Sequence, residues 1–181
     1  MSNFHLFKYC LALTCLLQSD LTSAQVAWRP VSTIVSFKIK NAGMYVDGNI
    51  DGFNGQLFFD ENTLAASYLK ASVNVANIKT GNSLRDEHLQ NANYFNAALF
   101  PKIEIASKKL YKKQSAFEGL FDITIKGITR ETMIPFQLTS NGIDALFTGT
   151  FTIDRRDFNV GGNSIMLSDR VTISIIVNAK K

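Results

Sequence analysis

A chain of 181 residues with 46% hydrophobic residues and three prolines suits one domain with a sizeable core, and it gives no reason to expect a second domain. Its formal net charge of +4 is too small to indicate a nucleic-acid-binding protein, so we expect no nucleic-acid partner. A single globular domain is therefore the expected organisation.

The first two dozen residues have the pattern of a secretory signal peptide. Lys8 precedes the apolar run 9–17, and small residues lead to an expected cleavage point after Ala24. The apolar run is far shorter than the roughly 20 residues that a membrane-spanning helix needs. We therefore expect residues 1–24 to be removed and residues 25–181 to form the exported domain, which would be periplasmic or secreted.

Both cysteines, Cys10 and Cys15, lie inside this leading segment. Cys15 could instead mark a lipoprotein signal, but Leu13 and Thr14 before it match poorly with the small residues that such processing prefers. Without the segment no cysteine remains, so the domain must fold by packing alone, although an exported destination would permit disulfides.

From residue 31 onward, apolar and polar residues alternate with the period of half-buried β-strands. In the first run Val31 is one of the apolar, inward positions, and only Ile34 breaks the pattern. The predicted strands occupy 31–39, a glycine-spaced region at 45–59, 69–75, 103–105, 117–125, 134–138, 147–153 and 171–177. This pattern predicts an all-β domain of about eight strands.

Short turns indicate that neighbouring strands are antiparallel. Two tight, glycine-containing loops, 126–130 and 140–142, each separate two alternating runs. No βαβ rhythm or internal repeat occurs, which leaves a sandwich or a barrel. We favour an extended barrel because closure removes exposed strand edges, although a sandwich would show similar alternation.

The interior of such a barrel is either filled by side chains or hollow enough for one small ligand. Ala71, Gly119 and Gly149 fall at inward positions, where they would leave space unless the glycines mark bends or bulges. A ligand held between these walls must be largely apolar. The inward residues expected to bind it are Val35, Phe37, Ile39, Leu69, Val73, Val75, Phe121, Ile123, Ile125, Phe147 and Phe151.

The segment 82–101 interrupts the strands. Asn82 or Ser83 can cap a short helix. Leu84, His88 and Leu89 recur at helical spacing, and Tyr94, Phe95 and Phe100 follow. We expect this crossover to place an apolar face on the barrel mouth, either as a structural plug or as a lid over a ligand, with Tyr94 and Phe95 among the binding residues.

Charged residues give little support for catalysis. His88 is the only histidine after the leading segment, and zinc needs three or four ligands for which no spacing argues. No GxSxG nucleophile elbow is present. Asp86 beside Arg85 is better explained by a salt bridge or a cap. We expect no enzyme activity, no metal site and no cofactor.

Three arginines, Arg130, Arg155 and Arg156, could hold a phosphate group by paired hydrogen bonds if they lay at the barrel mouth. The other interpretation, which we favour, is that they are solvated and paired with acidic neighbours. The available acidic residues are Glu131, Asp154 and Asp157.

Several separated motifs resemble those of the YceI-like family, in the same order. They are Arg85-Asp86 with His88-Leu89, Tyr94-Phe95-Asn96, Phe100-Pro101, the run 125–130, the run 151–155 with Asp157-Phe158, and Leu167 with Asp169 and Val171. The resemblance extends over nearly the whole of residues 25–181. Their combination is much more specific than any one motif.

The resemblance implies an extended, lipocalin-like antiparallel barrel that binds a polyisoprenoid or similar long-chain lipid in an elongated hydrophobic cavity, usually in the periplasm. Arg85 and Arg130 are then the first candidates for contacts with a diphosphate head group. Ser32 and Asn41 stand where many members carry histidines, which argues against head-group contacts at these two positions.

Other functions stay open beside that of a lipid carrier. The barrel could be packed and bind a partner through its outer surface or loops, or it could modify a lipid if a titratable group faced the cavity. Transient contact with a membrane and formation of a homodimer are both compatible with a carrier.

Overall fold

The computed structural model describes residues 26–181, and the expected cleavage point after Ala24 lies outside this range. The strands are β1 (Ala27–Asn41), β2 (Met44–Ile50), β3 (Asn54–Phe58), β4 (Tyr68–Asn74), β5 (Ile78–Lys79), β6 (Lys102–Lys113), β7 (Ala116–Ile125), β8 (Ile128–Ser140), β9 (Asp144–Asp154) and β10 (Leu167–Lys180). The helix is α1 (Ser83–Gln90), and the 3-10 turns are η1 (Leu64–Ala66), η2 (Val75–Asn77) and η3 (Arg155–Phe158). Over this range of the chain, no helix has the length and apolar character that crossing a membrane requires.

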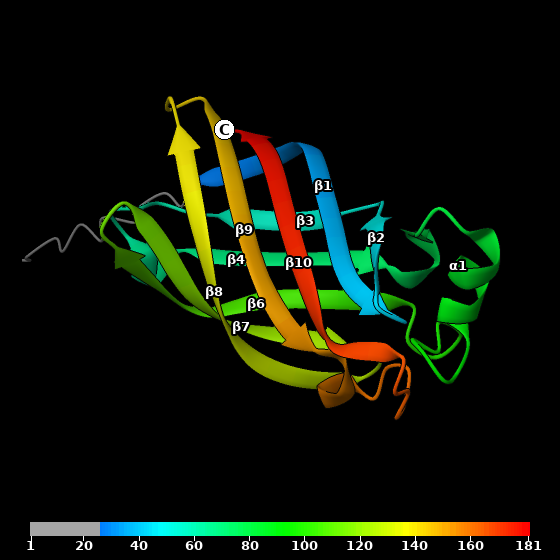
Figure 1. The fold of residues 1–181 in the computed structure, drawn as a ribbon. Coiled ribbons are helices and arrows are strands. Elements are labelled where there is room, and N and C mark those ends of the chain that lie inside the picture. Colours follow the sequence, from blue (N-terminus) through cyan, green and yellow to red (C-terminus); the bar gives the residue numbers. More distant parts are fainter. Residues whose placement is uncertain (1–25) are drawn as a thin grey trace, which may run out of the picture.

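Ten strands form one sheet, and the eight other than β2 and β5 close into an antiparallel barrel. Their order is β1, β3, β4, β6, β7, β8, β9 and β10, and β10 pairs back with β1. β2 and β5 extend the wall beside the C-terminal half of β1. Figure 1 shows the elongated barrel with α1 at one end. The predicted fold class, an antiparallel barrel with a short helical crossover, is confirmed.

The hairpin between β7 and β8 turns over two residues and is tighter than the expected loop 126–130, because Ile128, Thr129 and Arg130 already pair with β7 as part of β8. Lys126 and Gly127 have φ angles of 51° and 74°, as both central residues of a type I′ turn must. A Cβ atom at Gly127 would lie 2.6 Å from the Phe100 ring, so glycine is needed both for its backbone and for its missing side chain. Ile125 pairs with Ile128 across the turn, which starts the barrel wall in register.

A β-bulge in β1 changes which of its residues face inward. The pairing with β10 shifts after Pro30, which makes Val31 an additional residue in β1. Trp28 before the bulge and Val35 after it are both buried, although one is an even and the other an odd position. Val31 is 59% exposed, so the prediction that it faces the interior is wrong.

Aromatic side chains fill the end of the barrel where β1 begins. Phe59 is 1% exposed, and its ring contacts those of Phe117, Phe136 and Phe147 at centroid distances of 5.0, 5.7 and 5.9 Å. The Trp28 indole donates a hydrogen bond to the Phe59 carbonyl at 2.9 Å. This end is therefore packed, and any cavity must lie towards the other end.

The crossover begins with the predicted cap, since the Asn82 side chain accepts a hydrogen bond from the Arg85 backbone N–H at 3.0 Å. The helix itself buries no residue, and Leu84 is 61% exposed. The expectation that Leu84 belongs to a packed helix face is wrong. Tyr94 and Phe95, which follow the helix, pack against the hydrophobic core instead.

Candidate functional site

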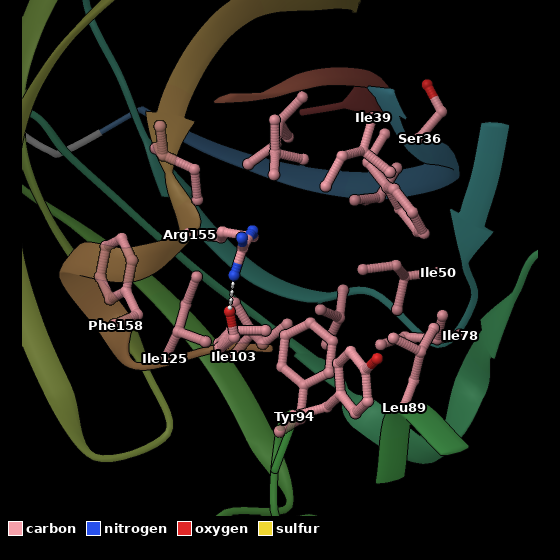
Figure 2. Close-up of a pocket in the computed structure, with 18 of the residues that line it drawn as sticks. Ser36, Ile39, Ile50, Ile78, Leu89, Tyr94, Ile103, Ile125, Arg155 and Phe158 are labelled. Carbon is pink, nitrogen blue, oxygen red and sulfur yellow. Dashed lines mark hydrogen bonds between the residues drawn. The ribbon is translucent and has the colours of Figure 1, made fainter. Parts of the chain in front are cut away.

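The barrel end beside α1 contains a cavity of about 390 Å³. Its lining comes from β1, β2, β4, β5, β6, β7, β9 and β10, and the crossover supplies Leu89, Tyr94 and Phe95. Figure 2 shows Ile39, Ile50, Leu89 and Tyr94 around the same interior space. The volume lies in the range of about 300–1,000 Å³ that is usual for small-molecule sites.

Most residues predicted to bind a ligand line this cavity. They are Val35, Phe37, Ile39, Val73, Tyr94, Phe95, Ile123, Ile125 and Phe151, together with Arg85. Residues separated by more than a hundred positions meet here because alternate residues of each strand point to the same face of a closed sheet. The wall is mainly aliphatic and aromatic, which suits an apolar ligand.

A second, inner cavity of about 90 Å³ lies towards the packed end. Its lining includes the other predicted residues Leu69, Phe121 and Phe147, as well as Gly149. The residues that line both cavities, and so lie at their boundary, are Phe53, Ala71, Ile105, Phe151 and Ile175. The interior is thus a larger outer and a smaller inner compartment.

The three small inward residues differ in what surrounds them. A Cβ atom at Gly119 would lie 2.4 Å from the Phe121 ring and 2.8 Å from Leu110, so neighbouring side chains already occupy that place. Gly149 and Ala71 border a cavity. Small residues therefore contribute open volume at two of the three expected positions.

Two of the predicted site residues lie outside both cavities. Val75 is buried, but β4 ends at Asn74 and η2 interrupts the strand alternation from which its inward direction was predicted. Arg130 is exposed on β8 and donates to the Thr129 carbonyl at 3.2 Å. Neither residue takes part in the cavity wall.

Glu131, expected as a partner for the arginines, binds a lysine instead. The Lys108 ammonium forms an ion pair and a hydrogen bond with Glu131. This hydrogen bond, helped by the nearby charge of Asp122, raises the pKa of Lys108. Glu131 and Lys108 are both on the exposed outer surface, away from the cavity.

Polar side chains gather where the crossover meets the cavity. Arg85 donates from Nε to the Thr80 hydroxyl and from a terminal nitrogen to the Thr80 carbonyl, both at 2.7 Å. Asp86 accepts from the Thr80 N–H at 2.9 Å and from its hydroxyl at 2.5 Å. Of the two expected roles for Asp86, a salt bridge with Arg85 or a cap, the salt bridge does not occur within residues 26–181, because both side chains bind Thr80.

Arg85, Thr80 and His88 all line the cavity. Two of the guanidinium N–H groups of Arg85 are engaged by Thr80, and the planar guanidinium carries five. The others can donate to an anionic group of a ligand. This arrangement gives an apolar cavity with one cationic group at its mouth.

Arg155 is the buried charged residue of the described chain, with 3% exposure, and it also lines the cavity. Its acceptors are the carbonyls of Val160, Gly162, Ser164, Leu167 and Ser168, at 2.7 to 3.3 Å, and Asp169 Oδ1 at 3.0 Å. Figure 2 shows its guanidinium at the cavity wall with one of these bonds dashed. It ties the segment before β10 to the barrel.

The expectation that Arg155 and Arg156 are solvated is confirmed only for Arg156. Arg156 is 54% exposed and pairs with Asp169 at 2.7 Å and with Asp154 at 3.9 Å. Arg155 is wrongly predicted, because its side chain is buried and its acidic partner is Asp169, outside the expected set. Arginine side chains are mostly exposed in proteins, so the sequence carried no signal that Arg155 would be buried.

Several cavity residues were missed because they lie outside the clear alternating runs. Phe53 follows Gly52 between two short strands, and Ile50 and Ile78 face each other in the β2–β5 pair. Leu167 begins β10 ahead of its regular part. The apolar residues of the glycine-spaced region were the available signal for Phe53 and Ile50.

Acidic, histidine and cysteine side chains do not gather into a metal site in the described residues: no group of three or more could hold an ion. His88, which lines the cavity, is accompanied there by Glu104 but not by a nucleophile–base arrangement like that of an acyl-transfer site. The geometry therefore offers an apolar cavity with polar side chains where the crossover meets it.

Comparison with known proteins gives consistent matches. The YceI-like domain matches residues 27–179. A UPF0312 protein of Yersinia pestis (strain Pestoides F) is 27% identical over 133 residues, which cover 70% of this chain and 69% of the relative.

Solved structures share the fold. BcnA of Burkholderia cenocepacia aligns with a TM-score of 0.78 and 23% identity, over 82% of this chain and 96% of its own. A polyisoprenoid binding domain from Saccharophagus degradans, implicated in plant cell wall breakdown, aligns with a TM-score of 0.64 and 10% identity, over 85% and 97% of the two chains. At these identities the two structures establish the architecture alone.

Proposed function

The chain belongs to the YceI-like family, and from this premise we propose that it binds one polyisoprenoid or similar long-chain lipid inside its barrel. The observation that carries the proposal is the apolar cavity of about 390 Å³ at the end beside α1. The Saccharophagus degradans domain, named for polyisoprenoid binding, has the same architecture, which supports this ligand class.

Affinity would come from removing the lipid chain from water. Each Å² of apolar surface that the cavity covers contributes about 25 cal/mol, from which the entropic cost of association is subtracted. The apolar residues of the wall supply this contact, and Arg85 supplies a positive charge at the mouth. A prenyl chain with a terminal phosphate or diphosphate would combine both features.

We further propose that residues 1–24 direct export and that the mature protein carries the lipid in the periplasm. The pattern of Lys8 followed by an apolar run, and the usual location of the family, support this part. A carrier with this cavity would shield the lipid chain from water between the membranes.

The competing functions have weaker support. A barrel that acts only through its outer surface would not need an apolar cavity. An enzyme would need a titratable group positioned to exchange protons or attack a substrate, and His88 on an exposed helix turn is the nearest candidate. Binding without chemistry is therefore the function that the site supports best.

The direct test is mass spectrometry of an organic extract from the mature protein, exported and purified without detergent. We expect one prenyl or other long-chain lipid per protein molecule. An empty protein that also takes up no added polyprenol would overturn the proposal and favour a partner-binding barrel.

Replacement of Arg85 by glutamine tests the polar end of the site. We expect Arg85→Gln to weaken binding of a prenyl diphosphate about tenfold, because one charge-assisted hydrogen bond contributes about 1.5–3 kcal/mol. Binding of the uncharged prenol should be unchanged. Titration with fluorescent analogues of both lipids measures the difference.

The matched control is Arg130→Gln, which removes the same charge from a position outside both cavities. We expect it to leave both affinities unchanged. Equal losses in the two variants would indicate a general effect of net charge and remove Arg85 from the site.

A further inference from the structure

We propose that the rim of the cavity mouth docks on the surface of an anionic lipid bilayer. The rim is defined here as Met44 and Tyr45, which begin β2, together with Ile165 and Met166, which precede β10. The inference deepens the proposed function, since a lipid carrier must exchange its ligand with a membrane. Its geometry and its test do not depend on the identity of the ligand.

The rim is an apolar surface that faces water. Exposure is 73% for Met44, 68% for Tyr45, 98% for Ile165 and 58% for Met166. Contiguous exposed apolar groups on a soluble domain usually mark an interaction site. These residues lie close together, because the Ala42 N–H donates to the Met166 carbonyl at 2.8 Å.

The rim adjoins the cavity opening. Asn41, which precedes the β1–β2 turn, and Leu167, which follows Met166, pair with each other across β1 and β10, and both line the cavity. Ser164, next to Ile165, lines it too. A chain entering or leaving the cavity beside these residues would pass the rim, so a bilayer placed there would meet the opening directly.

The exposed position of Ile165 is held by partly buried hydrogen bonds of the neighbouring backbone. Arg155 binds the carbonyls of Gly162, Ser164 and Leu167 at 2.7, 3.3 and 3.1 Å, on both sides of Ile165. The backbone of this segment is therefore anchored to the barrel while the Ile165 side chain points away from it. Such an arrangement presents an apolar side chain at low entropic cost for an insertion event.

Basic residues lie near the rim and indicate that the bilayer on which it docks is anionic. Lys40 and Arg170 are exposed, and within the described chain neither forms an ion pair. Lys38 lies 5.6 Å from the centre of the Tyr45 ring, although it also pairs with Asp47 at 3.1 Å. An apolar tip with an interfacial tyrosine and cations behind it is the usual pattern of proteins that rest on anionic bilayers.

The carboxylates near the rim do not cancel this charge. Asp154, opposite Arg170 in the β9–β10 register, lies 3.9 Å from Arg156 and accepts from the Arg156 backbone N–H. Asp169 is engaged by Arg155 at 3.0 Å and by Arg156 at 2.7 Å. Asp47 is engaged by Lys38. Lys40 and Arg170 therefore remain available to lipid phosphates, and the complementarity favours a bilayer over an acidic or neutral protein surface.

The test is sedimentation of lipid-free protein with phosphatidylcholine vesicles that contain or lack phosphatidylglycerol. We expect binding to the vesicles that contain phosphatidylglycerol, and weaker binding at high salt. The double variant Ile165→Ser, Met166→Ser should bind at least about tenfold more weakly, because two apolar side chains no longer enter the interface. Lys40→Gln and Arg170→Gln should each weaken binding about fivefold, only when phosphatidylglycerol is present.

The chain offers a matched control in Ile143, which is 68% exposed in the turn between β8 and β9 at the opposite end of the barrel. Ile143→Ser removes one exposed side chain of the same type as Ile165 and should leave vesicle binding unchanged. Equal losses for Ile143→Ser and the rim variants, or no binding of the wild-type protein, would overturn the proposal.

Two further measurements separate the explanations. Prenol uptake without vesicles reports on the cavity alone, and we expect the rim variants to retain it. Sedimentation velocity reports on self-association: a wild-type dimer that the rim substitutions dissociate would assign the rim to a second copy of the chain and would also overturn the proposal. If the wild-type protein binds vesicles but takes up no prenol, the proposed function is contradicted and the docking proposal is not.

Discussion

Replacement of Arg155 by methionine lowers the free energy of unfolding by about 3–5 kcal/mol, which is the largest effect on stability that we expect from a single polar side chain here. The Arg155 side chain is 3% exposed, and the five N–H groups of its guanidinium serve six acceptors, five of which are backbone carbonyls between residues 160 and 168. Methionine fills similar space but donates none. The carbonyl of Val160 would lose its partner in a buried setting, and Asp169 would lose one of its two cations.

Thermal and urea unfolding measure this effect, and the loss corresponds to a decrease in Tm of about 10 °C for a domain of this size. Arg156→Gln is the matched control, since Arg156 is 54% exposed and its ion pairs contribute about 0–1 kcal/mol. Arg155→Lys should recover little, because an ammonium group cannot reach acceptors distributed around a planar fork. A Tm of Arg155→Met equal to that of Arg156→Gln would show that the buried hydrogen bonds are not needed for stability.

Replacement of Ala71 by tryptophan reduces the amount of copurified lipid at least about tenfold, which is the largest effect that we expect on the proposed function. Ala71 lies at the boundary of the two cavities, so a large ring there would occupy space in the outer compartment and close the inner one. The added ring takes the place of part of the lipid, and each Å² of apolar lipid surface that the cavity no longer covers lowers the binding free energy by about 25 cal/mol. The available volume should let the variant fold.

The measurement is mass spectrometry of extracted lipid, combined with thermal unfolding to verify the folded state. Ala76→Trp is the control. Ala76 is exposed in η2, so this substitution adds the same ring outside the barrel. Wild-type lipid content in a folded Ala71→Trp variant would exclude the cavity as the binding site. Phe121→Trp is a less suitable cavity-filling variant. Phe121 is 5% exposed and packs against Phe136 and Gly119, so a larger ring there would disturb the core.

The boundary between the cavities also bears on ligand length. A chain that fits the outer compartment alone would end against the side chains of Phe53 and Phe151, whereas a longer chain needs both to move. On the proposed function, the inner cavity would hold the end of a chain that passes this boundary. The preference for a chain length would then depend on Phe53 and Phe151 and not on Arg85.

The sequence by itself determined the class of fold and the part of the cavity wall that regular strands form. Strand alternation fixed inward residues such as Phe37 and Ile123, because side chains of a strand alternate strictly between its two faces. Local turn chemistry likewise identified the Lys126-Gly127 hairpin and the Asn82 cap, since both depend on neighbouring residues only.

Only the tertiary structure decided the features that depend on contacts between distant segments. The bulge that turns Val31 outward is a register shift against β10 next to Pro30, and strand alternation by itself does not predict the shift. The burial of Arg155 requires a segment that folds back over it, and the division into a packed and a hollow end requires Phe59 to meet rings from three other strands. Periodicity reports which face a residue occupies, whereas the closure of the sheet decides what stands opposite that residue and whether space remains between them.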